Sequence, residues 1–116
     1  MIERSALLAL IEAELAAVAD PAAREAMRGV MLADPIAMRC AWDYGAADET
    51  FPCWRVAARE DCGVGVVYCE LGFGPKCPWG LVWLNEAVPR MGMDSGWFCA
   101  LREALADLLD EPEWAA

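Results

Sequence analysis

The chain has 116 residues, a formal net charge of −10 and no histidine, and 59% of its residues are apolar. This length predicts a single domain over residues 1–116, and the apolar content is sufficient for a core without metals or disulfides. The acidity argues against direct binding to nucleic acid or to an anionic membrane, because both are polyanions. It favours a basic protein partner, or it serves only to keep the chain in solution.

Six cysteines are present, at positions 40, 53, 62, 69, 77 and 99. The N-terminal segment is interrupted by Glu12 and Glu14 and does not match a secretory signal, and no apolar run is long enough to span a bilayer. We therefore expect a cytoplasmic protein with reduced thiols. The cysteines lack C-x-x-C spacing and the chain lacks histidine, so we expect no metal site and no cofactor.

Two helices are predicted at the N-terminus. Residues 2–19 carry apolar side chains at helical spacing. Asp20 then provides an N-cap and Pro21 suits the first position of a second helix, which we expect over 21–32. This helix is expected to end before Asp34-Pro35, because the residue before a proline disfavours helical backbone.

Four strands are predicted next, over residues 36–44, 51–59, 64–71 and 81–84. They are rich in β-branched and aromatic residues or alternate between apolar and polar. The short connections between the first three strands favour an antiparallel meander. Pro52 makes the beginning of the second strand an unlikely central position, because proline cannot donate a ladder hydrogen bond.

A last helix is predicted at the C-terminus, with Asp94 or Ser95 as its N-cap and an end before Pro112. Its apolar stripe begins at Trp97 and Phe98. The expected fold is therefore α+β, with two N-terminal helices, a four-stranded antiparallel sheet and one C-terminal helix. We expect the helices to pack on one face of the sheet.

The segment 68–83 has the densest combination of glycine, proline and large aromatic residues in the chain. Gly72–Pro75 is not a phosphate-binding loop, because it lacks the full motif and leads into a strand instead of a helix. Phe73 and Trp79 sit on this rigid frame. They either seal the open end of the core or form a contact surface for a partner. Their solvent exposure decides between these alternatives.

Candidate catalytic residues are few. A catalytic thiol needs a base or an electropositive setting, and only Cys99 has one, because it falls in the first turn of the predicted last helix. Cys40 and Cys69 lie in predicted strands and are expected in the core. Glu70 interrupts an apolar strand, where it either faces solvent or pairs with Arg55. The carboxylates of the turns have no apolar surroundings and are expected to be solvated.

These observations favour a small acidic, non-enzymatic module that binds a basic protein. In size and charge it is comparable with immunity proteins, antitoxins and phage-encoded inhibitors. One alternative is a small enzyme that uses a carboxylate or thiol near the aromatic loop, and another is an acidic dimeric chaperone for a secreted protein; the oligomeric state stays open. The candidate binding residues are Phe73, Lys76, Trp79, Glu70 and Asp94, and the candidate enzymatic residues are Glu70, Asp94 and Cys99.

Overall fold

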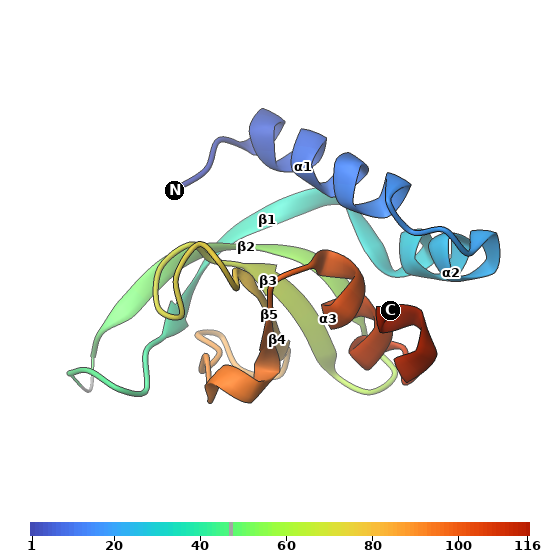
Figure 1. The fold of residues 1–116 in the computed structure, drawn as a ribbon. Coiled ribbons are helices and arrows are strands. Elements are labelled where there is room, and N and C mark those ends of the chain that lie inside the picture. Colours follow the sequence, from blue (N-terminus) through green and yellow to red (C-terminus); the bar gives the residue numbers. More distant parts are fainter. Residues whose placement is uncertain (47) are drawn as a thin grey trace.

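The computed structural model describes residues 1–46 and 48–116. Within these residues the chain is an α+β fold of three α-helices and a five-stranded antiparallel sheet (Figure 1). Two short 3-10 helices complete it. The elements are α1 (Arg4–Ala16), α2 (Pro21–Val30), β1 (Met31–Ala41), β2 (Thr50–Arg59), β3 (Val64–Tyr68), β4 (Trp79–Trp83), η1 (Asp94–Gly96), β5 (Trp97–Phe98), α3 (Leu101–Leu108) and η2 (Pro112–Ala115).

The strands form a meander in the order β1-β2-β3-β4-β5, and each strand is antiparallel to its neighbours. The predicted antiparallel sheet is confirmed, but the predicted number of four strands is wrong. The additional strand is β5, which pairs Phe98 with Trp79 and Trp97 with Gly80. β3 is also shorter than predicted, because it ends at Tyr68.

The C-terminal helix begins later than predicted. Trp97 and Phe98 pair with β4, so α3 starts only at Leu101. Its first amides are satisfied by carboxylates: Ala100 N donates to Glu103 Oε1 at 3.0 Å, and Leu101 N donates to Glu14 Oε1 at 2.7 Å. Cys99 therefore lies before the helix and not in its first turn, and the argument that the helix dipole favours a thiolate no longer applies to it.

Two prolines lie within strands: Pro35 is inside β1, which begins earlier than predicted, whereas Pro52 is near the beginning of the second strand, as predicted. The second helix ends at Val30, and Pro35 lies inside β1, at a register shift on the edge of the sheet where a missing amide is tolerated. Pro52 lies in β2, which has a strand on each side. However, the last pair between β2 and β3 joins Trp54 to Tyr68, so Pro52 has a paired neighbour on the β1 side alone.

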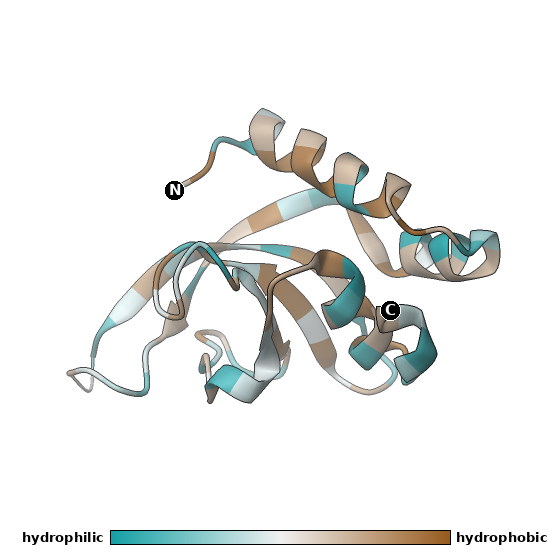
Figure 2. Ribbon diagram, viewed as in Figure 1, coloured by the Kyte–Doolittle hydropathy of each residue, from teal (hydrophilic) through white to brown (hydrophobic). Residues whose placement is uncertain are grey.

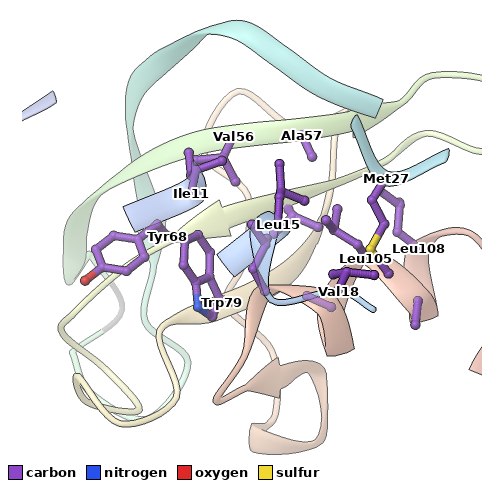
Figure 3. Close-up of a cluster of buried hydrophobic side chains, with 14 of the residues drawn as sticks. Ile11, Leu15, Val18, Met27, Val56, Ala57, Tyr68, Trp79, Leu105 and Leu108 are labelled. Atoms are coloured by element: carbon purple, nitrogen blue, oxygen red, sulfur yellow. The ribbon is translucent and has the colours of Figure 1, made fainter. Parts of the chain in front are cut away.

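The helices cover one face of the sheet. Figure 1 shows α1 crossing above the strands, and Figure 2 shows apolar colour along α1 and the central strands, whereas α2 and the turn at Asp94 are more hydrophilic. Beneath α1 and α3 lies the larger core cluster, which we call the helix-side core. It includes Leu7, Val66 and Leu101. Figure 3 labels further members of this core: Ile11, Leu15, Met27, Val56, Tyr68, Trp79 and Leu105.

The opposite face of the sheet has its own smaller core, which we call the strap-side core. Residues 84–96 connect β4 to β5 and pass across this face; we call this segment the strap. Cys40 and Cys69 are buried here, as predicted, together with Met91 of the strap and Trp97. None of the helices in residues 1–46 and 48–116 is both long and apolar enough to cross a membrane.

Candidate functional site

The strap is fixed to the outer edge of β1 by backbone hydrogen bonds. Ala41 N donates to Pro89 O at 2.8 Å, and Met91 N donates to Ala41 O at 3.0 Å. Trp97 adds an indole hydrogen bond, from Nε1 to Met91 O at 2.8 Å. The strap thus links β4 to β1, the far strand of the sheet. Hydrogen bonds to the residues that it crosses hold this irregular segment in place.

Asp43 holds the strap beside the end of β1. One of its carboxylate oxygens accepts from Arg90 at 2.6 Å, and the other accepts from Gly92 N at 2.7 Å. A carboxylate that bridges a side chain and a backbone amide fixes the position of both. Asp43, Arg90 and Gly92, which these contacts hold together, all line one open cleft.

An open cleft of about 740 Å³ lies between the strap and β4, next to the end of β1; we call it the strap cleft. Its apolar lining includes Tyr44, Trp83 and Met93, whose exposed fractions are 59%, 61% and 67%. β5 pairs with Trp79 and Gly80 alone, which leaves the rest of β4 beside the cleft without a β5 residue next to it. Exposed apolar side chains gathered at one concave surface are typical of binding sites.

Charged side chains border the same cleft. Asp43, Glu86 and Arg90 line it, and Asp94 follows the lining residue Met93 directly in the chain and is exposed. The Asp43 carboxylate is engaged with Arg90 and Gly92, whereas Glu86 is an exposed residue of the strap. The cleft therefore combines large apolar side chains with carboxylates at its border.

The two aromatic side chains of the 68–83 segment have different positions. Trp79 is 1% exposed and lies in the helix-side core beside Tyr68, with their ring centroids 4.8 Å apart (Figure 3). It seals the core, and a partner could not reach it in the folded chain. Phe73 is half-buried and covers the strap-side core. Its ring centroid is 5.1 Å from that of Trp42 and 5.7 Å from that of Trp97. Lys76 is exposed.

Glu70 has a role that the sequence analysis did not foresee. Its Oε1 accepts a hydrogen bond from Ile2 N at 3.1 Å, and the carbonyl of Ile2 accepts one from Trp54 Nε1 at 3.1 Å. Glu70 thus fastens the N-terminus to the sheet and does not pair with Arg55. In the described part of the chain, Arg55 Nε is buried with no hydrogen-bond partner.

The ionisation of Tyr68 makes the stability of the folded chain depend on pH. Burial, reinforced by the nearby Glu70 carboxylate, raises the pKa of Tyr68 to about 12 from an ordinary value of 10.0. The ring is 6% exposed, and Figure 3 shows its hydroxyl on the side away from the other labelled side chains. The folded state therefore holds this proton more tightly than the unfolded state does.

We expect Tyr68 to contribute to alkaline unfolding. Because its pKa is raised in the folded state, its contribution is fully present below about pH 10 and is lost as the pH rises towards about 12. The pKa difference corresponds to about 2–3 kcal/mol. Urea unfolding across this pH range should show a smaller loss for Tyr68→Phe than for the unsubstituted chain. Equal losses in the two proteins would assign the alkaline transition to other groups.

The three candidate enzymatic residues lie in separate places. Glu70 borders a small cavity of about 90 Å³, which neither Asp94 nor Cys99 lines. Asp94 belongs to η1, and Cys99 follows β5 with its sulfur against that of Cys77. Over residues 1–46 and 48–116, no three His, Cys, Asp or Glu side chains are grouped so that they could hold a metal ion.

Sequence reasoning did not identify Tyr44, Trp83 and Met93 as site residues. Tyr44 and Trp83 belong to the apolar pattern of predicted strands, which favours burial. However, β1 ends at Ala41, so Tyr44 lies in the turn beyond the strand, and Trp83 is the last residue of β4, beyond the two residues that pair with β5. Periodicity reveals neither of these boundaries. The one available signal was the run Asn85–Met93, whose proline and glycine indicate an irregular segment of unusual length between two elements.

Comparison with known proteins adds no family. No protein-family model matches the chain, and neither curated proteins nor solved structures include a significant match.

Proposed function

We propose that this chain is a small acidic protein-binding module, and that the strap cleft is where its partner docks. The partner would be a basic protein that inserts an apolar or cationic side chain into the cleft. Immunity proteins, antitoxins and phage inhibitors are the kinds of protein in which a module of this size and charge would neutralise a basic partner. The proposal locates the contact on Tyr44, Trp83 and Met93.

The observation that carries the proposal is the exposure of these three large side chains around one cleft. Each is more than half exposed. Tryptophan and tyrosine are enriched among the residues that dominate binding energy, because they bury a large area at a low cost in side-chain entropy. Leaving three such residues in water at one site brings the folded monomer no stability, whereas a partner would gain by covering them.

The negative charge of the chain favours a partner with a positive net charge. The net charge is −10, Asp43 and Glu86 line the same cleft as the exposed rings, and Asp94 follows the lining residue Met93 in the chain. A lysine or arginine side chain could lie over the face of Trp83 or Tyr44, where the ring attracts a cation, with a carboxylate close by. The overall negative field would also accelerate the approach of a basic protein.

Affinity capture with matched variants tests the proposal. Three immobilised proteins are incubated with lysate from the source cells: the unsubstituted chain, the Trp83→Ser variant and the Leu8→Ser variant. Leu8 is 40% exposed and lies on α1, across the sheet from the strap, so its substitution removes a similar exposed apolar group. A partner of the cleft should be recovered by the unsubstituted chain and by Leu8→Ser, and its yield should fall at least tenfold with Trp83→Ser. Its recovery should also decrease as salt is added.

Circular dichroism and urea unfolding of the three proteins provide the control for folding. If a basic protein is recovered equally by the unsubstituted chain and by a folded Trp83→Ser, the partner does not use the cleft. If Leu8→Ser alone loses the partner, the binding surface is on the helix side of the sheet.

A further inference from the structure

Cys77 and Cys99 form a close pair of thiols at the surface. Their sulfur atoms are 2.8 Å apart, which is less than 1 Å beyond the length of a disulfide bond, about 2.05 Å. Cys99 is exposed and Cys77 is half-buried. Both are free thiols in this structure, and small molecules in solution can reach the pair through Cys99.

The fold holds the two residues in this arrangement. The β4–β5 pairing begins beside them, with Trp79 opposite Phe98. On one side, Cys77 N donates to Gly74 O at 3.3 Å within a turn. On the other, Cys99 is confined between β5 and the first residue of α3. Two cysteines fixed close together by the backbone need little rearrangement to join.

We propose that Cys77 and Cys99 are a reversible redox pair that closes to an intramolecular disulfide when the chain meets a low-molecular-weight disulfide. The Cys99 thiolate attacks the small disulfide, forms a mixed disulfide and releases one small thiol. The Cys77 thiolate then attacks the sulfur of Cys99, forms the Cys77–Cys99 bond and releases the second small thiol. The protein gives up two electrons and two protons, and the small disulfide is reduced to two thiols. This inference is independent of the proposed binding function.

The other cysteines serve as internal controls. Cys40 and Cys53 have sulfurs 3.0 Å apart, a similar distance, but both are fully buried in the strap-side core. An oxidant cannot reach them in the folded chain. Cys62 is exposed and its thiol is 3.6 Å from Arg59 O, with no cysteine recorded beside it in the described residues. Cys62 should therefore stop at a mixed disulfide.

Treatment of the native chain with oxidised glutathione, followed by acid quenching and peptide mass spectrometry, tests the proposal. We expect a cross-link between the peptides of Cys77 and Cys99, one glutathione on Cys62, and free thiols at Cys40 and Cys53. Cys77→Ser should retain glutathione on Cys99, because the second thiol is missing. Dithiothreitol should reverse each product.

Three results would overturn the proposal. The first is native Cys99 that carries glutathione at the same level with and without Cys77. The second is a cross-link that forms only after denaturation, when Cys40 and Cys53 also react. The third is oxidation that joins two chains through Cys99, which a non-reducing gel reveals. The gel is run with the Cys62→Ser variant, so that oxidation at Cys62 contributes no bands.

Discussion

Replacing Trp79 with alanine is expected to destabilise the fold by about 3–5 kcal/mol, the usual cost of removing a buried tryptophan from a core. Its side chain is among the largest fully buried ones, at 1% exposure, and it packs edge-to-face against Tyr68. Domains are stable by only about 5–15 kcal/mol, so this loss removes a large share of the free energy of unfolding, and at the lower end of that range it leaves a substantial unfolded population. Urea unfolding followed by circular dichroism measures the change.

Trp83→Ala is the matched control, because Trp83 is on the same strand and is 61% exposed. Its substitution should change the stability by no more than about 0.5 kcal/mol. The two variants thus separate the two roles of tryptophan in β4: Trp79 acts on folding, and Trp83 is available for recognition. Similar losses of stability in both would contradict the burial described for Trp79.

Gly80→Ala is expected to cost about 3 kcal/mol, at the upper end for a group forced into a packed core. A Cβ atom at this position would lie 2.4 Å from the ring of Trp97. The ring cannot simply turn away, because it is 5% exposed and its Nε1 donates to Met91 O. The added methyl group should therefore separate β5 from β4 and loosen the strap as well. The midpoint of urea unfolding should fall accordingly.

Gly29→Ala provides a control that should change the stability in the opposite direction. Gly29 is an exposed residue of α2, and a Cβ atom there would meet nothing within 4 Å. Alanine favours helix over glycine by about 0.5–1 kcal/mol, so this substitution should stabilise the chain. If Gly80→Ala were neutral while Gly29→Ala stabilised, the close approach of Trp97 to Gly80 would be disproved.

Local signals in the sequence were sufficient for the helices and strands that are governed by their own neighbours. Asp20 caps α2 as predicted, since Ala22 N donates to its Oδ1 at 2.9 Å, and Pro21 begins the helix. The first three strands and their antiparallel connections were recognised from alternation and short turns. Such features depend on adjacent residues, which is why they can be derived without the fold.

Long-range pairing was the part that the sequence did not reveal. Trp97 and Phe98 precede Leu101, Leu105 and Leu108 at helical spacing, so their periodicity extends the predicted helix backwards. Only the proximity of β4 makes them a strand. Long-range packing also explains why Trp79 is buried and Trp83 is exposed, although both are tryptophans of the same strand. Trp79 is covered by the helix-side core, whereas Trp83 lies at the end of β4, beyond the residues that pair with β5.

The attachment of the strap to Ala41 also has a consequence for how the sheet meets other chains. An uncovered outer strand is a template on which a second molecule can add its own strand, which is a common beginning of aggregation. In β1 this outer border is interrupted twice, by Pro35 at the register shift and by the strap at Ala41. The opposite border ends in a strand of two residues, Trp97–Phe98. Pro35, the strap and the short β5 thus reduce the length of sheet border on which a second chain could add a strand.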